Sequence, residues 1–458
     1  MIVKRFASLS LAPLAIALFA AAPAHAQLSA GAGDATVDLA PLLPMQGFGI
    51  EHDKLHARVL LLANGTARVA LVSMDLTSMF DDEVAEVKRI VSAATRVDAA
   101  NILVCASHTF SAPHVQPAGN VPPNLGGGSP VEMEKGARYR VAVNEAVTSA
   151  ATAAARSLRP AHGGFASGQS DVNVNRNMET AEGWWLGADA SGPSDKQLSV
   201  FKLDDEGGKP IAVLLNYAVQ SSVMDQAKVG EAKAVTADLG GAAASYVEER
   251  FGGAVSIFLP GAAGDQAPIL TANRYRIGPD GRAQRIDVGE KGYLLLDLLG
   301  ERLGSDALRV GAGALRVGAG AVNAAAGGDR LQVVAGSVTL DALERSRGPA
   351  RATRTHEFTV SGKTDAPFWI MRIGDIVIVG AQVELSASTG IFIKQHSPFP
   401  NTMVVTMVNG AAKYMPDAES YKRITYQALG SPYGPGSGEV FAGKIVDALV
   451  ALRRSGGK

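Results

Sequence analysis

Two residues that could bind a metal or move a proton each follow an apolar run. His108 comes shortly after residues 102–105, and Glu384 after residues 376–379. Histidine is a common metal ligand and changes its charge near neutral pH, while a buried carboxylate is rare unless it is paired or coordinated. The two therefore suit metal-assisted hydrolysis or acid–base catalysis. Taken alone, either could equally be a hydrogen-bonded structural residue.

Other side chains could complete such a site. His114 lies six residues after His108. It is either a loop residue or a residue that takes over the role of a metal ligand or a base. Tyrosine often fills a core with one polar end, so Tyr414 and Tyr426 are open to a structural or a functional interpretation. Trp184 and Trp185 stand together in a polar stretch, and paired exposed aromatic residues often line a hydrophobic or aromatic ligand site.

The common catalytic signatures are absent from the sequence. It contains no His-Glu-x-x-His pair, no Cys-x-x-Cys pair and no Gly-x-Ser-x-Gly elbow. The segment 438–444 has phosphate-loop spacing, but Ile445 replaces the hydroxyl residue, so we interpret it as the start of a helix. The single cysteine, Cys105, lies in an apolar run and is expected to be a core residue.

Length, charge and the first residues indicate the class of protein. The chain has 458 residues, of which 47% are hydrophobic and 19% charged, and its net charge is -1, so nothing indicates a nucleic-acid partner. Lys4 and Arg5, an apolar stretch over residues 9–22 and the sequence Ala24-His-Ala26 form the three parts of a secretory signal peptide. We expect residues 1–26 to be removed and residues 27–458 to form one exported domain, periplasmic or secreted, without a transmembrane segment.

The elements that must position these residues follow an α/β pattern. Short β-rich runs over residues 57–72 and 101–105 alternate with helical stretches over residues 82–94 and 137–158, and residues 120–129 form a loop. The runs 211–219, 254–259 and 376–379 are expected to be buried strands, with ligands gathering beyond their carboxyl ends. The stretch 307–313 recurs unchanged at 314–320, which we interpret as a duplication within a surface connection.

A series of segments resembles the neutral, non-lysosomal ceramidase family. The segment Ala106-Ser-His108-Thr-Phe110-Ser-Ala-Pro113 is similar to the family's Thr-His-Thr-His-Ser-(Gly/Ala)-Pro. Further matches follow in family order over nearly the whole mature chain, at residues 55–60, 69–75, 173–177, 195–196, 216–220, 236–240, 261–265, 379–384, 414–426 and 433–436. The resemblance implies an α/β catalytic domain of mixed sheets flanked by helices, here lacking the small C-terminal β domain of some members.

The resemblance also implies a zinc ion held by two histidines, a glutamate and a tyrosine. Position by position, His108 matches the first histidine, Glu384 the glutamate and Tyr414 the tyrosine, while Gln220 stands in place of the second histidine. Phe110 replaces a histidine that assists the reacting centre, and Ala267 occupies a serine position next to Asp265. Arg176 matches the arginine that stabilises the oxyanion, with an ion pair to Asp195 or Asp265 as the structural alternative. We count Arg176, Tyr426, His114 and Asp265 as candidate catalytic residues.

Three hypotheses follow. The first is a secreted ceramidase-like amidohydrolase with a weakened zinc site, acting on an N-acyl or hydrophobic substrate. The second is a lyase that needs no metal or cofactor and acts on a phenolic or aromatic compound, because Phe110, Gln220 and Ala267 alter the hydrolytic groups. The third is a non-catalytic protein that binds lipids or small molecules. In each case Phe110, Trp184, Trp185 and Ala267 are expected to line the pocket.

Overall fold

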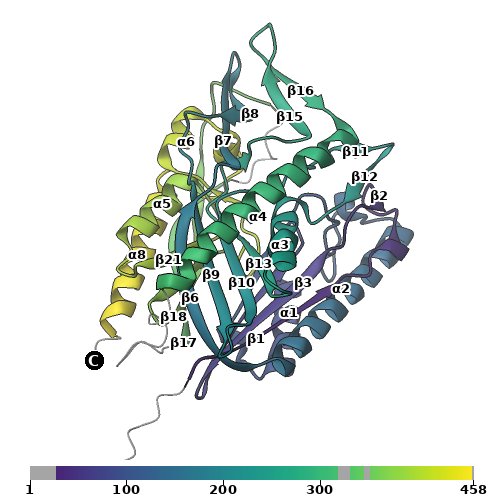
Figure 1. Ribbon diagram of the computed structural model, residues 1–458. Helices are drawn as coiled ribbons and strands as arrows, with labels where there is room; N and C mark the ends of the chain where they lie inside the picture. Colours follow the sequence, from purple (N-terminus) through teal and green to yellow (C-terminus); the bar gives the residue numbers. More distant parts are fainter. Residues whose placement is uncertain (1–26, 318–330, 345–350, 456–458) are drawn as a thin grey trace, which may run out of the picture.

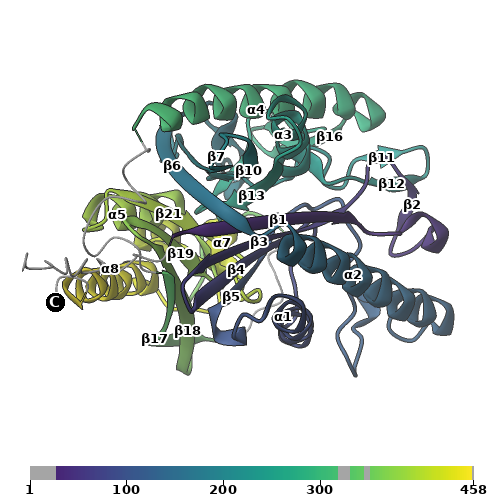
Figure 2. The ribbon, with the colours of Figure 1, turned by 60° about the horizontal axis from the view of Figure 1, so that its bottom comes forward.

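The protein folds into four layers, two stacked β-sheets between two layers of helices (Figures 1 and 2). The computed structural model describes residues 27–317, 331–344 and 351–455. The expected signal peptide and the last three residues of the second repeat copy, 318–320, lie outside these ranges. In the described residues, no helix is long and apolar enough to cross a bilayer.

The larger sheet has eight strands in the order β13-β10-β9-β6-β1-β3-β4-β5. It is mixed: β4 pairs with β5, and β10 with β13, in parallel, whereas the remaining neighbours run antiparallel. The strands span β1 Ser29–Thr36, β3 His56–Asn64, β4 Ala67–Met74, β5 Ile102–Ala106, β6 Arg159–Gln169, β9 Gln197–Asp205, β10 Pro210–Tyr217 and β13 Val255–Pro260.

Four helices cover the outer face of this sheet. Helices α1 (Asp81–Thr95) and α2 (Pro130–Arg156) pack on β3, β4 and β5, while α3 (Asp238–Arg250) and α4 (Gly292–Val317) pack on β9 and β10. The approach of α2 to β1 requires glycine, because a Cβ atom at Gly33 would lie 2.1 Å from the Ala150 carbonyl oxygen.

The smaller sheet, in the order β17-β18-β19-β21, packs against the inner face of the larger one. Side chains of both sheets, such as Leu214 and Ile378, form a shared core. The opposite face of the smaller sheet is covered by α5 and α8. These elements span β17 Leu331–Leu343, β18 Val360–Ile373, β19 Ile376–Ala381, β21 Asn401–Val405, α5 Ala387–His396 and α8 Ser437–Ser455.

Short elements connect the main strands and helices, among them β7, β8, β15 and β16 near the top of Figure 1. They are β2 Phe48–Glu51, β7 Asn173–Thr180, β8 Gly183–Asp189, β11 Lys228–Val229, β12 Ala232–Val235, β14 Gln266–Pro268, β15 Asn273–Ile277, β16 Ala283–Asp287, β20 Glu384–Leu385, β22 Tyr414–Met415, α6 Ala418–Arg423 and α7 Tyr426–Leu429. Single 3₁₀ turns lie at Ala40–Leu42, Ala99–Asn101, Pro123–Leu125 and Gly289–Lys291.

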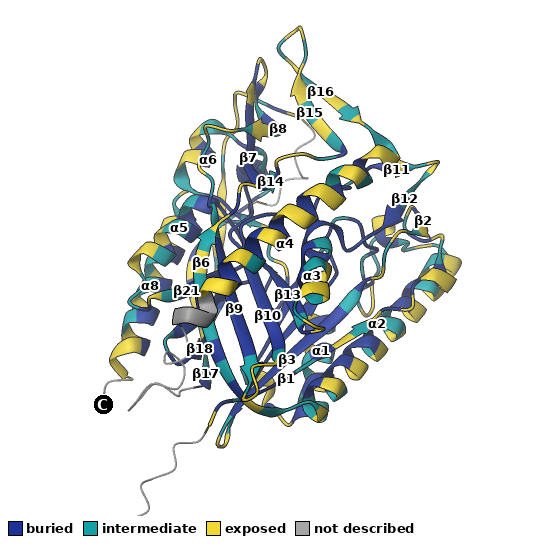
Figure 3. Ribbon diagram, in the orientation of Figure 1, coloured by how far each residue is buried: buried dark blue, intermediate teal, exposed yellow. Residues whose placement is uncertain are grey.

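The predicted mixed α/β architecture is confirmed, and Figure 3 shows the strands buried beneath helices with exposed outer faces. Two expectations were wrong. Helix α2 begins at Pro130 rather than at residue 137, because Ser129 caps it through a hydrogen bond to the Glu132 amide. The first repeat copy is not a surface connection: it continues helix α4, in which Ala307 and Val310 are buried.

Candidate functional site

The candidate residues follow the carboxyl ends of four strands that belong to two different sheets. His108 follows β5, Gln220 follows β10, Asp265 follows β13 and Glu384 follows β19. All four side chains are buried, with 1–7% of their surface exposed. The segments are joined beyond the strand ends, where Thr109 pairs with Ser221 and the Gly264 amide donates to the Leu385 carbonyl at 2.9 Å. Residues far apart in sequence therefore meet beyond the strand ends, as expected for an α/β ligand site.

His108 and Glu384 form the centre of the site. The Nδ1 atom of His108 lies 2.6 Å from the Thr77 carbonyl oxygen, which accepts but cannot donate, so the ring proton is on Nδ1. The other nitrogen, Nε2, lies 3.2 Å from Oε2 of Glu384. The same carboxylate oxygen accepts a hydrogen bond of 3.0 Å from Nε2 of Gln220.

Glu384 is ionised in this arrangement. Burial by itself would raise the pKa of its carboxyl, but the charge and hydrogen bond of His108, together with Arg176 and Lys413, outweigh burial and lower the pKa below its ordinary value. When His108 carries its second proton, Nε2 donates to this carboxylate. When His108 is neutral, Nε2 and the carboxylate are both acceptors, and a metal ion can take the place of the proton.

His108 has a strained backbone, with φ at 62° in the left-handed region. Its neighbours hold it there: the Ser107 amide donates to the Met74 carbonyl at 2.8 Å, and the Phe110 amide donates to the Ser221 carbonyl at 3.0 Å. The Thr109 hydroxyl donates to the Thr236 carbonyl at 2.8 Å. Such strain is characteristic of functional sites, where surrounding bonds enforce an unfavourable conformation.

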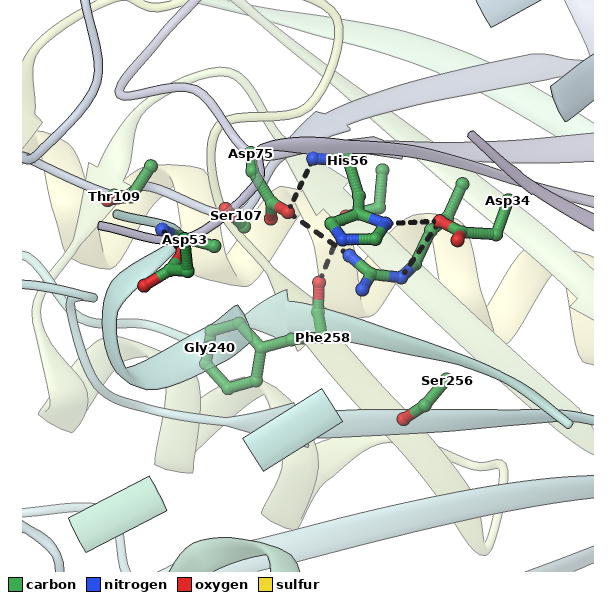
Figure 4. A network of polar contacts seen from close by, with 12 residues as sticks. Asp34, Asp53, His56, Asp75, Ser107, Thr109, Gly240, Ser256 and Phe258 are labelled. Atoms are coloured by element: carbon green, nitrogen blue, oxygen red, sulfur yellow. Dashed lines mark hydrogen bonds and ion pairs between the residues drawn. The ribbon is translucent and has the colours of Figure 1, made fainter. Parts of the chain in front are cut away.

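A buried polar network lies beneath this loop (Figure 4). Asp75, at the end of β4, accepts from the His56 amide at 3.0 Å and from Arg58 at 3.1 Å. Arg58 also contacts Asp34 at 3.5 Å and Glu248 at 3.3 Å, and Asp34 lies 2.8 Å from Nδ1 of His56. The network ties β1, β3 and the end of β4 together, and β4 in turn anchors the His108 loop.

Arg176 is held by the main chain rather than by an acid. Its Nε and Nη2 atoms donate to the Gly264 carbonyl at 3.1 and 2.6 Å. The two alternative ion-pair partners have other roles, since Asp195 pairs with Lys394 at 2.6 Å and Asp265 accepts from the Ala387 amide at 2.8 Å. The guanidinium group therefore retains its charge beside the site.

Tyr414 and Tyr426 pack against Arg176. Their rings lie 5.5 and 5.8 Å from its guanidinium carbon, and the two ring centres are 6.0 Å apart. Tyr414 is also paired with Glu384 in register between β22 and β20. Burial and the charge of Glu384 raise the pKa of the Tyr414 phenol, so it keeps its proton at neutral pH.

Asp265 contacts Asn175, Arg176 and Ala387. Its carboxylate accepts from the Ala387 amide and, at 3.2 Å, from Asn175, and burial raises its pKa to about 6. Its carbonyl accepts from the Arg176 amide at 2.9 Å. Asp265 therefore positions Arg176 and the loop after β13 instead of facing the reacting centre.

Two hollows open onto the site. The first, here called the Arg176 cleft, has a cavity volume of about 230 Å³ and includes Gln220, Ala267 and Arg285 in its lining. The second, the Phe110 hollow, has about 180 Å³ and includes Thr77, His114 and Lys233. Gln226 lines both, so they adjoin. Together the two hollows have room for a small molecule.

Phe110 and His114 lie on one side of His108. The Phe110 ring meets the His108 ring edge-on, with centres 4.7 Å apart. Burial, Lys233 and Lys413 lower the pKa of His114, so its imidazole is neutral and able to accept a proton.

Trp184 and Trp185 are not a pair of exposed aromatic residues. Trp185 is 7% exposed and packs edge-on to Tyr426, with ring centres 5.5 Å apart. The Trp184 ring instead lies under Arg423, at 4.7 Å. Successive residues of strand β8 point to opposite faces, which separates the two rings.

Sequence analysis missed Asp225, which lines the Arg176 cleft. Its Oδ1 atom is buried and has no hydrogen-bond partner among the described residues. Burial raises the pKa of this carboxyl, although Lys233, Arg176 and Arg285 oppose the shift. An acidic residue five positions after Gln220 is the only sequence signal, and no known spacing distinguishes it.

Two side chains of the site, His108 and Glu384, have the chemistry to bind a divalent cation. His108 presents Nε2, with Nδ1 bound to a carbonyl as in many metal-ligating histidines, and Glu384 presents an ionised oxygen. Gln220 and Tyr414 can add only a neutral amide oxygen and a protonated phenol. No cluster of three or more His, Cys, Asp and Glu residues occurs in the described part of the chain. These ligands should therefore bind a metal ion more weakly than a site with two histidine ligands.

Comparison with known proteins identifies the fold. No protein-family model matches the sequence, and no curated protein matches it as a relative. Two solved structures are similar, "Ceramidase complexed with C2" and the neutral ceramidase from Pseudomonas aeruginosa, each with a TM-score of 0.68 and 16% identity. The matches cover 94% of this chain and 76% and 75% of those chains, respectively. The chain therefore has the fold of the neutral ceramidases, as its sequence motifs predicted.

Proposed function

We propose that the Arg176 cleft is the active site of a hydrolase that cleaves an amide or related acyl bond, and that His108 and Glu384 hold a divalent cation such as zinc there. The supporting observation is the 3.2 Å contact between Nε2 of His108 and Oε2 of Glu384, which are both acceptors when His108 is neutral and could then share a cation. The similarity in fold to neutral ceramidases agrees with this chemistry.

The chain's own residues have distinct tasks in this reaction. When bound, the cation would polarise the carbonyl group and lower the pKa of water. Thr77 orients the His108 ring, and Gln220 holds Oε2 of Glu384. Arg176, fixed by the Gly264 carbonyl, supplies a positive charge for the developing oxyanion.

Asp225 is the proton donor in this proposal. Its raised pKa keeps Oδ1 protonated to higher pH than an ordinary aspartate, and it lines the same cleft as Arg176. A carboxylic acid there can donate its proton to the departing nitrogen, which otherwise leaves as a poor amide anion. This replaces the proton transfer that Phe110 cannot perform.

The test combines metal analysis with turnover of N-acyl substrates of several chain lengths. We expect about one divalent ion per purified chain, loss of hydrolysis on chelation and its return with zinc. Glu384→Gln should lose both the ion and activity, whereas Asp225→Asn should keep the ion and lose roughly 10² to 10⁴ in rate. Full hydrolysis by metal-free protein would contradict the proposal.

One observation favours a second function, a metal-independent lyase. With His108 protonated, Glu384 accepts from both His108 and Gln220, so the pair is satisfied without a metal. An imidazolium, a carboxylate and the phenols of Tyr414 and Tyr426 can then catalyse proton abstraction and elimination. Turnover of a phenolic compound by chelated protein, with no hydrolysis of amides, would support this function instead of the first.

We also propose export to the periplasm or beyond, because residues 1–26 have the composition of a signal peptide. Fractionation of cells that express the full chain, with N-terminal sequencing of the product, tests this. Mature protein should begin at Gln27. Full-length protein in the cytoplasmic fraction would contradict export.

A further inference from the structure

The lining of the Arg176 cleft contains three arginines, Arg176, Arg274 and Arg285, and one acid, Asp225. Asp225 lies within the electrostatic reach of three cations, Lys233, Arg176 and Arg285. The known partners of these cations are neutral: Arg176 donates to a carbonyl, Arg285 donates to the side chain of Asn273 at 2.8 Å, and Lys233 lies 4.1 Å from the centre of the Phe48 ring. In the described part of the chain, none of the three forms a salt bridge.

The β15–β16 hairpin directs Arg285 at the cleft. Arg285 is paired in register with Tyr275, and Asn273 lies two residues before Tyr275 on the same strand face. All three line the cleft, and the bond from Arg285 to Asn273 holds the guanidinium group over it. Arg274 also lines the cleft and bonds to the Thr271 carbonyl at 3.3 Å, whereas Arg276 on the same hairpin is not part of the lining and bonds to the side chain of Gln284 at 3.3 Å.

The side chains that line the cleft are mostly polar or charged, and of those in the described chain only Leu186 and Ala267 are aliphatic. In the adjoining Phe110 hollow, Phe48, Phe110 and Leu125 offer apolar contacts beside polar residues such as Asn124 and Lys233. An anionic group therefore has its charge partners in the cleft, and an apolar group can contact the Phe48 and Phe110 rings beyond Gln226.

We infer that the substrate is an amide whose amine half carries a carboxylate, as in an N-acylated amino acid. The carboxylate is held by Arg285 at the rim of the Arg176 cleft, the scissile carbonyl lies at Arg176, and the acyl group enters the Phe110 hollow. This assignment rests on the proposed function for the bond that is cleaved, but the charge preference of the cleft does not depend on turnover. Guanidinium groups bind carboxylates through charge-assisted, often bidentate, hydrogen bonds.

Calorimetric binding of N-benzoylglycine and its neutral carboxamide to the mature protein tests this inference. We expect the carboxylate to bind at least about tenfold more tightly than the carboxamide at low salt, with a smaller ratio at high salt. Arg285→Gln should abolish most of this preference. The matched control, Arg276→Gln, alters the same exposed hairpin outside the cleft lining and should keep it; equal melting temperatures would show that both variants are folded.

Equal binding of the two compounds, no binding of either, or equal losses in the two variants would overturn the inference. Failure of the proposed function would look different. In that case the carboxylate preference and its dependence on Arg285 would be found, but no amide would be cleaved with or without zinc. Conversely, cleavage of neutral N-acyl amides without any charge preference would retain the proposed function and reject the carboxylate.

Discussion

Nε2 of His108 lies 3.2 Å from Oε2 of Glu384, although 276 residues separate them in the chain. The Thr77 carbonyl keeps a proton on Nδ1, so in the neutral tautomer Nε2 directs its lone pair at a carboxylate. This contact makes the site responsive to cations, because a proton and a metal ion compete for the same position.

Replacing Gln220 with histidine should strengthen metal binding. The Gln220 amide already contacts Oε2 of Glu384 at 3.0 Å, so an imidazole there would add a second nitrogen ligand. We expect zinc affinity to rise about tenfold or more, which corresponds to roughly 1.4 kcal/mol. Competition with a chromophoric chelator measures it, and Gln220→Leu, which offers no ligand, should show no gain. Equal affinities in the two variants would show that residue 220 does not face the ion.

Replacing Phe110 with histidine should increase the rate of amide hydrolysis. The Phe110 ring lies next to His108 and lines the hollow beside it, but it cannot transfer a proton. A positioned general acid or base contributes roughly 10²-fold or more, so kcat should rise by about that factor in Phe110→His. Phe110→Leu serves as control for the loss of the ring. A rise in Phe110→Leu as well would indicate relief of crowding rather than proton transfer.

Glu83 should make stability depend on pH between about 4.5 and 7. It is fully buried in the first turn of α1, 3.1 Å from Arg140, and burial raises the pKa of its carboxyl to about 7 despite that arginine. The folded state therefore binds this proton more tightly than the unfolded state, so the group's contribution is lost as pH rises from 4.5 to 7. The loss should be of the order of 3 kcal/mol at most.

Urea unfolding at several pH values measures this effect. Glu83→Gln, which cannot ionise, should remove the decline in the free energy of unfolding between pH 4.5 and 7. Glu145→Gln, on the exposed face of α2, should leave the decline unchanged. A decline of equal size in the Glu83→Gln variant would assign the pH dependence to other groups.

Asp75→Asn should destabilise the fold. Asp75 and Arg58 are each 3% exposed, and removing one partner leaves part of a buried charge uncompensated. We expect a loss of about 3 kcal/mol in the free energy of unfolding. The exposed pair of Asp375 and Arg453 provides the control, since Asp375→Asn should cost about 1 kcal/mol or less. Similar losses in both variants would mean that burial of the network contributes little.

Local patterns in the sequence were sufficient for much of the fold. The 3.6-residue periodicity over residues 82–94 predicted helix α1, and the apolar run at residues 376–379 predicted β19, because both signals depend on neighbouring residues. The start of α2 and the helical repeat were missed. Ser129 and Pro130 form a capping signal within a stretch rich in turn residues, and Ala307 and Val310 are buried only because α4 packs on the larger sheet.

The sequence by itself supplied the candidate residues: His108 and Glu384 from their type and position after apolar runs, and Arg176 and Tyr414 from the family resemblance. Only the tertiary structure decided how they meet. Packing of the two sheets brings His108 and Glu384 together, strand β8 directs Trp184 and Trp185 to opposite faces, and the fold places Asp225 near cations from three separate segments. Protonation, ion binding and substrate charge depend on distances through space, which a linear pattern of residues does not contain.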